Sequence, residues 1–289
     1  MTVSIVSCKT STIQSYLHIG SGQEFSEPIK DFPNEYDFNK LVDSLAQRLS
    51  LGANDFARVG GMPVIPASSV KGNIRARLEL SFKASNGRAR ACFTRASRYP
   101  SVLSYWRHKK IWGDVLREDR GSACDLTQIN RVCLLCDLFG TAGLSGLISF
   151  EDFVGKDVKL EEVKVDGIRM LVAPPGSEFK GQIYFNNLVE EELGLLLLGM
   201  GLKDSVRGRP LLLGRLKYRG QVGSRLVGRV MYVVKSLQLS KYSRNIADFN
   251  SKSYESESVL THLIQSLAAS ALRKFATELR LVDEVVNLA

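Results

Sequence analysis

The stretch IPASSVKGNIRARL, from Ile65 to Leu78, combines a helix start, an apolar helix face and a cluster of basic side chains. Pro66 disfavours helix at the residue before it, and Ser68 or Ser69 can cap the free amide groups of a helix that begins at this point. Apolar residues then recur at every fourth position, which predicts a helix with one buried face: Val70, Ile74, Leu78 and Phe82. We therefore expect a helix that starts at the serines.

The other face of this predicted helix is basic. Lys71, Arg75 and Arg77 follow a helix N-terminus, whose free NH groups and dipole already favour an anion. Gly72 would let a sugar-phosphate backbone approach the helix closely. This combination indicates an RNA-binding element. The alternative is an ordinary capped surface helix with solvated charges.

Composition places the chain among globular proteins. Its 289 residues are 44% hydrophobic, which is enough for one large core or two modest ones. No apolar run reaches the ~18 residues that cross a bilayer, and the N-terminal sequence does not resemble a secretory signal. We expect a cytoplasmic protein without a membrane partner. The net charge of +9 weakly favours a polyanionic partner.

Basic residues are concentrated in one tract. Between Lys71 and Lys110 there are 11 basic residues and one acid, Glu79, whereas the segment from Glu24 to Asp55 is mainly acidic. Aromatic residues are interleaved with the basic ones, as expected where RNA bases stack beside phosphate-binding side chains: Phe82, Phe93, Tyr99, Tyr105 and Trp106. Any one of these aromatics can instead belong to the core.

Strand and helix signals along the chain predict an α+β fold. The expected strands are 3–7, 12–19 with a glycine turn at 18–22, 147–153, 168–172, 182–185 and 227–238. The expected helices are 36–51, 69–83, 188–201 and 256–281, the last as one long helix or a pair. No clean boundary divides the sequence, so we expect a single domain, 1–289, with an inserted lid at about 86–136.

Five cysteines are present, an odd number, and a chain without a secretory signal belongs in a reducing compartment, where disulfides are a poor default. The spacing of Cys133 and Cys136 lets two thiolates bind one tetrahedral zinc ion. Cys124 can supply a third ligand, and His108 or Cys92 the fourth. We favour a structural Zn²⁺ in the inserted lid, and the alternatives are buried free thiols or a redox pair.

A second basic segment, residues 213–230, reads LGRLKYRGQVGSRLVGRV. Glycines alternate with arginines and a lysine, so the loop can bring backbone amides and guanidinium groups to a phosphate chain. The alternative is a solvated hairpin. Neither GxxxxGK[ST] nor GxGxxG occurs in the chain, which argues against the common nucleotide-binding and dinucleotide-binding loops.

Three segments in this order resemble the RAMP superfamily of CRISPR proteins: IPASSVKGNIRAR, then CLLCDLFG with GLISFED, then LGRLKYRG. HIGSG at 18–22 and PPGSEFKG at 174–181 are similar to further turns of that family. The resemblance covers roughly residues 12–235 and is greatest to backbone subunits of type III effector complexes, the Csm and Cmr assemblies. It implies a modified ferredoxin-like, RRM-type core with an inserted lid, followed here by a C-terminal helical extension.

The resemblance also implies a function. Family members assemble side by side along a guide RNA and grip its backbone through the helix and the glycine-rich loop, while guide pairing reads the target RNA. The partners would be guide RNA, target RNA, other subunits of the complex and further copies of the chain. The gripping positions here would be Ser68, Ser69, Lys71, Gly72, Arg75, Gly214, Lys217, Arg219 and Gly220.

Catalytic members of the family cleave the target RNA with an aspartate in the loop before IPxSS and a divalent metal such as Mg²⁺. Asp55 is the nearest match to this aspartate, and Asp31 and Asp37 are the second candidates. The alternative role of Asp55 is that of a turn residue. Members of the family usually carry a long β-hairpin called the thumb, and the segment available for it here, 155–168, is short. The expected function is therefore a metal-dependent endoribonuclease within the complex, or else a non-catalytic capping or scaffold subunit. A free-standing zinc-containing RNA-binding protein is a further alternative.

Overall fold

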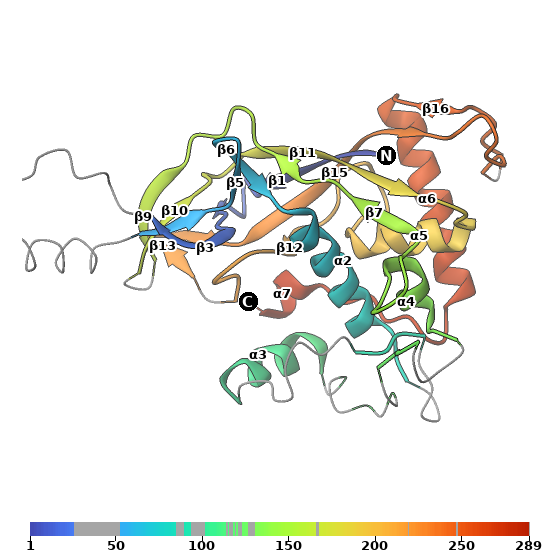
Figure 1. Ribbon diagram of the computed structural model, residues 1–289, viewed down its shortest axis with the longest axis horizontal. Helices are drawn as coiled ribbons and strands as arrows, with labels where there is room; N and C mark the ends of the chain where they lie inside the picture. The colour runs from blue at the N-terminus through green and yellow to red at the C-terminus, as the bar shows by residue number, and fades with distance from the viewer. Residues whose placement is uncertain are drawn as a thin grey trace, which may run out of the picture.

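The computed structural model describes residues 1–25, 53–84, 90–93, 102–113, 115, 118, 120, 123–126, 131–165, 168–218, 220–246 and 248–288 (Figure 1). Side chains within 23–25, 102–106 and at Ala53 are not described. The helix expected at 36–51 lies outside the described residues. So do Asp31, Asp37 and Arg219.

The strands, in chain order, are β1 (Thr2–Ser7), β2 (Ser15–Tyr16), β3 (Gly20–Phe25), β4 (Ala53–Phe56), β5 (Arg58–Val59), β6 (Met62–Ile65), β7 (Ile148–Phe150), β8 (Phe153–Val154), β9 (Glu161–Val165), β10 (Ile168–Val172), β11 (Glu178–Phe185), β12 (Leu211–Leu212), β13 (Gln221–Val222), β14 (Arg225–Val227), β15 (Arg229–Gln238) and β16 (Ser253–Tyr254). The helices are α2 (Ala67–Ser81), α3 (Val102–Trp112), α4 (Leu134–Phe139), α5 (Glu190–Gly199), α6 (Glu257–Lys274) and α7 (Glu284–Leu288).

The core elements follow one another as β1, α2, β7 with β8, β11, α5 and β15. In the main sheet β15 pairs with β1, β1 with β11, and β11 with both β7 and β8, all antiparallel. Ile5 at the centre of β1 lies between Phe179 of β11 and Tyr232 of β15. A strand–helix–strand unit repeated twice in this spatial order is ferredoxin-like. The expected α+β, ferredoxin-like class is confirmed.

The main hydrophobic core joins β1, β11 and β15 to α2, α5 and α6. Val70, Ile74 and Leu78 of α2 are at most 1% exposed, so the fourfold spacing marks the buried helix face. Gly199 at the end of α5 permits this packing, because a Cβ atom there would lie 2.8 Å from Cγ2 of Ile74. Of the basic residues of α2, Lys71 and Arg75 are thereby left partly exposed, whereas Arg77 is buried.

The start of α2 differs from the sequence expectation. The helix begins at Ala67, its N-cap residue is Pro66, and no side chain of its own cap accepts a hydrogen bond. Instead Oδ1 of Asp152, from the β7–β8 connection, accepts a hydrogen bond of 2.7 Å from the amide of Ala67. The prediction of a serine cap was wrong, because a carboxylate distant in sequence accepts the hydrogen bond from the first turn of the helix.

A smaller sheet, in the order β3–β4–β10–β9, lies beside the main one in Figure 1. The glycine turn expected at 18–22 is instead the place where β3 begins, at Gly20. The short segment expected in place of a thumb forms part of the hairpin of β9 and β10. This hairpin pairs with β4, through Met170 and Asn54, and so belongs to the smaller sheet.

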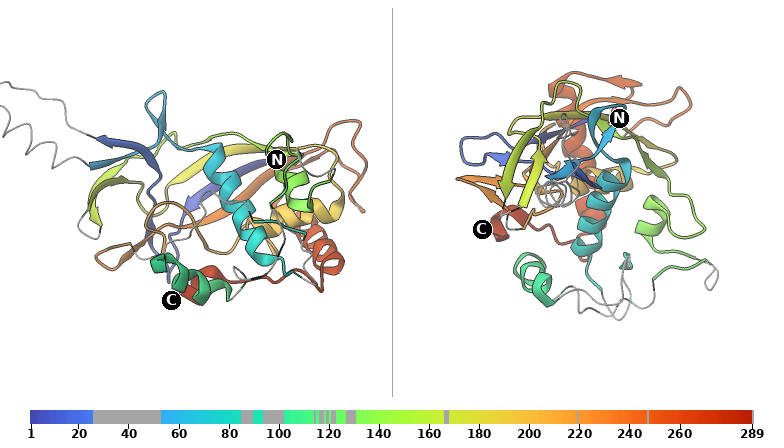
Figure 2. Two further views of the ribbon diagram at one scale, coloured as in Figure 1. Left: turned by 60° about the horizontal axis from the view of Figure 1, so that its bottom comes forward. Right: turned by 60° about the vertical axis from the view of Figure 1, so that its left-hand side comes forward.

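The described part of the C-terminal extension contains the strand β16 and the helices α6 and α7. The long α6 packs against α5, and the short α7 packs against α3 and β12, so that α7 and α3 lie side by side (Figures 1 and 2). No helix within the described ranges is both long and apolar enough to cross a membrane.

Candidate functional site

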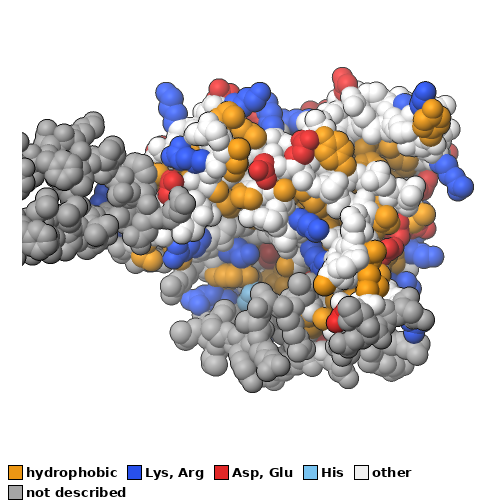
Figure 3. Space-filling view, viewed as in Figure 1, with side chains coloured by type: hydrophobic (Ala, Val, Ile, Leu, Met, Phe, Trp, Pro, Cys, Tyr) orange, Lys and Arg blue, Asp and Glu red, His pale blue; other side chains and the backbone are white. Residues whose placement is uncertain are grey.

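Two clefts flank α2, one on each side. The first, which we call the loop cleft, has a volume of about 540 Å³ and separates α2 from the glycine-rich loop 212–218 and α3. The second, the lid cleft, has a volume of about 440 Å³ and separates α2 from residues 139–150, which follow α4. In Figure 3 Lys and Arg side chains are spread over this face of the molecule, and some lie in the region of α2. The helix expected to grip RNA is therefore bordered by cavities.

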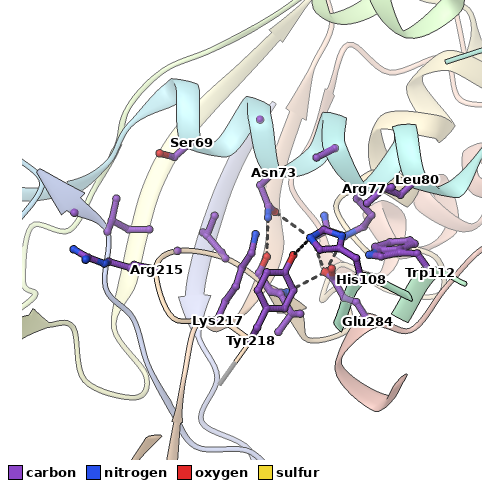
Figure 4. A pocket seen from close by; sticks show the side chains of 17 residues that line it. Ser69, Asn73, Arg77, Leu80, His108, Trp112, Arg215, Lys217, Tyr218 and Glu284 are labelled. Atoms are coloured by element: carbon purple, nitrogen blue, oxygen red, sulfur yellow. Dashed lines mark hydrogen bonds and ion pairs between the residues drawn. The ribbon is translucent and has the colours of Figure 1, made fainter. Parts of the chain in front are cut away.

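Helical spacing determines which α2 residues line the loop cleft. Ser69, Asn73, Arg77 and Leu80 recur every three or four positions and lie along one side of the helix (Figure 4). Gly72 lies between them, is exposed, and has no atom within 4 Å of the place where a Cβ would be. A large ligand group can thus reach the α2 backbone at this point.

The opposite wall is the glycine-rich loop, whose course depends on glycine. Gly214 has a φ of +86°, and Gly228 at the end of the returning chain has a φ of +82°. A Cβ on Gly228 would lie 2.8 Å from Cβ of Lys217, so only glycine permits the close return of the chain. Nη1 of Arg229 donates a 2.9 Å hydrogen bond to the carbonyl of Lys217. Lys217 is held in this way with its side chain directed toward α2 (Figure 4).

A buried ion pair closes one end of the loop cleft. Arg77 donates from Nε at 2.9 Å and from Nη2 at 2.6 Å to Oε1 of Glu284 in α7. The same oxygen accepts a 2.9 Å hydrogen bond from the amide of Leu212. Asn73 donates to the carbonyl of Leu212 at 2.7 Å. Helix α2, the glycine-rich loop and α7 are thereby joined at one place.

His108 of α3 forms the third wall together with Tyr218. The hydroxyl of Tyr218 and Nε2 of His108 lie 3.1 Å apart, and the two ring centroids 5.3 Å apart. Burial, and then the charge of Lys217, lowers the pKa of His108. Burial also raises the pKa of Tyr218 to about 12. Both rings are consequently neutral near pH 7.

Lys217 supplies an amine to the same cleft. Burial, and then the charge of Arg77, lowers its pKa, while Glu284 acts in the opposite direction. Its ammonium lies 5.3 Å from the centroid of the Tyr218 ring and makes no hydrogen bond or ion pair within the described part of the chain. Burial thus disfavours charge on Lys217, and an anionic ligand beside the amine would favour the protonated form, so binding of the anion and of the proton would support each other.

The lid cleft is lined by the neighbouring side of α2. Ser68, Lys71 and Arg75 face the backbone and hydroxyl groups of residues 139–150. Arg75 is largely committed to internal contacts, since it donates to Glu79 from Nε at 2.8 Å and to the carbonyl of Gly140 from Nη1. Burial lowers the pKa of Lys71, whose ammonium makes no hydrogen bond among the described residues. Lys71 is thus the more available cation in this cleft.

Four cysteines form a cluster next to the lid cleft. The sulfur atoms of Cys92, Cys124, Cys133 and Cys136 all lie within 4.8 Å of one another. Four thiolates around one ion with metal–sulfur bonds of ~2.3 Å lie about 3.8 Å apart, so the cluster fits a tetrahedral metal ion. Hydrogen bonds from the thiols of Cys136 and Cys92 lower the pKa of Cys133, which favours a thiolate there. The cluster could bind a metal.

Hydrogen-bond donors surround these sulfur atoms. Nη2 of Arg75 lies 3.2 Å from Sγ of Cys136, the amide of Cys133 lies 3.2 Å from Sγ of Cys124, and the amide of Cys92 donates to Sγ of Cys133 at 3.4 Å. Such donors stabilise metal-bound thiolates. Arg75 also connects the cluster to α2. Cys92 is the fourth sulfur, whereas His108 lies in the loop cleft.

Asp55 lies on β4 and does not line the loop cleft. Its Oδ1 accepts a 2.7 Å hydrogen bond from the amide of Phe56 and lies 3.5 Å from Nε of Arg58. The neighbouring Asn54 accepts a 2.8 Å hydrogen bond from Arg215, which lines the cleft. The side chain is 19% exposed, so one carboxylate oxygen can receive a further ligand. Within the described ranges Asp55 belongs to no group of three or more metal-ligating side chains.

Most of the residues predicted from the sequence to bind RNA lie in two different clefts of the structure. Those that line the loop cleft are Ser69, Gly72, Gly214 and Lys217. Those that line the lid cleft are Ser68, Lys71 and Arg75. Gly220 is buried at the base of the loop, where its amide donates to the carbonyl of Leu216. Asp31, Asp37 and Arg219 are outside the described residues.

Arg77, expected on the basic face of the helix, also lines the loop cleft. Other cleft residues were missed by sequence reasoning. Asn73 lies four positions after Ser69, so the helical period alone could have identified it. Tyr218 directly follows Lys217 in the glycine-rich loop. Trp112 and Glu284 carry no local signal, because their place in the cleft arises from the packing of α3 against α7.

Comparisons with known proteins place the chain in a family. The sequence model of the RAMP superfamily matches residues 11–243. No curated protein matches the chain. A chain in a solved structure described as "Type IV-B CRISPR Complex" is similar over 84% of this chain and 92% of that chain, with 13% sequence identity and a TM-score of 0.36. That likeness is too weak to support a conclusion about function.

Proposed function

Because the chain belongs to the RAMP superfamily, we propose that it is a guide-RNA-binding backbone subunit of a type III CRISPR effector complex. One observation carries this proposal: α2 and the glycine-rich loop, 130 residues or more apart in sequence, form the two walls of one cleft. The cleft contains Lys217 and has Arg215 at its mouth, while the charge of Arg77 is balanced by Glu284. Cations, an exposed glycine backbone and a hydroxyl suit a sugar-phosphate chain.

The basic lid cleft extends this surface across α2. Lys71 and Lys217 lie on opposite sides of the helix, and Gly72 lies next to Lys71 in the sequence. A single strand that crosses the helix at Gly72 would meet one lysine on each side. We infer that successive phosphates of the guide contact these two lysines, which leaves the bases free to pair with a target RNA.

Target cleavage is the enzymatic part of the proposal. Asp55 provides a partly exposed carboxylate, and the residue before it, Asn54, is bound by Arg215 of the loop cleft. Mg²⁺ commonly binds through one or two carboxylates, with water and substrate phosphates as the other ligands, so a single carboxylate fits this role. A bound divalent cation would stabilise charge on the scissile phosphate. Asp55 would position that ion, while Arg215 remains tied to Asn54 on the same strand.

We also propose that the cysteine cluster binds one structural Zn²⁺. The donor set of four sulfurs matches the preference of zinc for closed tetrahedral thiolate sites. The ion would connect the lid, through Arg75, to α2. Its role would be structural because no fifth side chain or open position is needed.

The experiment is reconstitution of the complex on a guide RNA with Lys71→Met, Lys217→Met and the double variant. The expected result is weaker guide binding in each single variant and a salt dependence that falls by about 0.7 in log–log slope per lost phosphate contact. Lys203→Met, an exposed lysine outside both clefts, is the matched control. Unchanged guide affinity in the double variant would contradict the proposal.

Cleavage is tested separately with Asp55→Asn in the same complex. Loss of target cutting with unchanged guide and target binding is expected, and Asp157→Asn, an exposed carboxylate in the β8–β9 connection, should cut at the normal rate. The short β9–β10 hairpin favours a second candidate, a non-catalytic capping subunit. That candidate predicts no change in cutting for either aspartate variant.

A further inference from the structure

The loop cleft is closed at one end. Figure 4 places Ser69 and Arg215 at one end of the cleft, and Trp112 and Glu284 at the other. The second end is packed by a hydrophobic cluster from α3, β12 and the C-terminal segment, made of Ile111, Trp112, Val115, Leu212 and Val282. Leu80 and Tyr218, which line the cleft, pack against this cluster. A strand that enters between Ser69 and Arg215 meets a wall at Trp112.

The inner part of the cleft is basic and polar. Lys217 makes no hydrogen bond or ion pair with a described residue, and the nearby Arg77 is neutralised by Glu284. The buried Nδ1 of His108 has no hydrogen-bond partner among the residues that the structure describes. Tyr218 presents its ring to Lys217 and its hydroxyl to His108. Aromatic rings and unpaired donors beside a lone cation are the groups that bind one nucleotide.

The volume is suited to such a ligand. At about 540 Å³ the cleft falls within the range of roughly 300–1,000 Å³ that small-ligand pockets occupy. It has room for the last nucleotide of a strand that crosses α2 at Gly72, whereas a strand that continued past Trp112 would need an exit at the closed end.

We propose that the loop cleft binds the terminal nucleotide of an RNA through its phosphate monoester, with Lys217 on the phosphate and the His108–Tyr218 pair beside the sugar or base. This inference rests on the proposed function, because it specifies which part of an RNA occupies the cleft. A monoester carries a charge of about −1.5 to −2 near pH 7, whereas an internal phosphodiester carries −1. A desolvated lysine therefore favours a phosphorylated end over an internal position. A free nucleoside monophosphate presents the same chemistry.

The test measures equilibrium binding of the full-length protein to short single-stranded RNAs of one sequence. These carry a 5′-monophosphate, a 3′-monophosphate or hydroxyl groups at both ends, and adenosine monophosphate serves as the free nucleotide. One phosphorylated form should bind roughly tenfold more tightly than the hydroxyl form at low salt, as one charge-assisted contact implies. Competition by adenosine monophosphate would identify a free nucleotide as a second source of the ligand.

Variants make the result specific. Lys217→Met should reduce the preference for the phosphorylated end to less than twofold, Lys217→Arg should retain it, and Lys203→Met should have no effect. Tyr218→Phe, which keeps the ring, should weaken binding of the phosphorylated and hydroxyl forms alike. Equal affinity of the wild-type protein for all ends, with Lys217→Met weakening every RNA equally, would overturn end recognition and leave RNA binding intact. Absence of salt-dependent RNA binding would instead overturn the proposed function.

Discussion

Oε1 of Glu284 accepts two hydrogen bonds from Arg77, so a carboxylate near the C-terminal end of the chain neutralises an arginine on the helix that is expected to grip RNA. Arg77 is 4% exposed and Glu284 7%, which places the pair in a medium where neither charge is well solvated. The width of the loop cleft is therefore fixed by an ion pair between segments that are 207 residues apart.

Removal of one partner of this pair should destabilise the protein strongly. We expect Arg77→Met to lower the free energy of unfolding by about 3–5 kcal/mol, because Glu284 is left as a buried, unpaired charge. The double variant Arg77→Met with Glu284→Met should be more stable than Arg77→Met alone. Urea denaturation of the two single variants and the double variant measures the coupling. Additive losses would contradict a buried interaction between the two side chains.

Gly72→Ala should change stability and RNA binding in opposite directions. A Cβ at this position meets no atom within 4 Å, and alanine is favoured over glycine within a helix by about 0.5–1 kcal/mol. The same Cβ would keep a phosphate chain away from the helix backbone, so RNA affinity should fall by about tenfold, or ~1.4 kcal/mol. Thermal unfolding and RNA titration measure the two effects.

Ser270→Ala is the matched control for this glycine. It also improves helix propensity, in α6, but it lines neither cleft, so it should leave RNA affinity unchanged. A Gly72→Ala protein that binds RNA at full affinity would exclude close approach of the strand at this point.

Metal removal should expose the four clustered thiols together. Elemental analysis is expected to find one zinc per chain, and serine substitution at Cys92 or Cys136 should reduce this content. Chelation should lower the midpoint of thermal unfolding by several degrees, since each kcal/mol corresponds to about 2–4 °C for a chain of roughly this size. Cys8→Ala tests the specificity of these effects, because Cys8 is buried elsewhere in the protein and should not affect zinc content. Undiminished zinc in Cys136→Ser would refute the assignment.

Stability should fall as the pH drops below about 6.5, partly because of two histidines. Burial lowers the pKa of His18 and of His108 in the folded protein, while the unfolded chain protonates near 6.5. Between the folded and unfolded pKa values the unfolded state therefore binds more protons, so each histidine subtracts up to about 1.4 kcal/mol per pH unit. His108→Gln should flatten this dependence between pH 7.5 and 5. Denaturant titrations at several pH values measure it, and an unchanged slope would be the contrary result.

The fold was predictable where periodicity reports on burial. The fourfold spacing of Val70, Ile74 and Leu78 gave the buried face of α2, and the strand at 168–172 was predicted with its observed bounds. The cap of α2 was missed because Asp152 comes from another part of the sheet. The turn predicted at HIGSG was wrong at Gly20. This glycine belongs to an extended strand paired with β4, where glycine is tolerated.

The site was predictable only in part. The spacing of Cys133 and Cys136 predicted that these two thiols lie close together. The choice of Cys92 or His108 as the fourth metal ligand depended on the position of α3, which no local sequence pattern encodes. Likewise the sequence placed Lys71 and Lys217 on one RNA-binding surface, whereas the division into two clefts follows from the helical rotation of about 100° per residue around α2.

The pairing of β3 with β4 brings Phe25 and Ala53, the described residues on either side of positions 26–52, opposite each other. Glu24 lies opposite Asn54 and Phe25 opposite Ala53, so the chain leaves the smaller sheet and returns to it at adjacent positions. Neighbouring antiparallel strands can be joined by a tight turn, so the β3–β4 pairing does not depend on the length of the connection. A short turn in place of residues 26–52 would remove Asp31 and Asp37 together and keep Asp55 on its strand. That single deletion would separate the candidate aspartates in a way that substitution of each alone cannot.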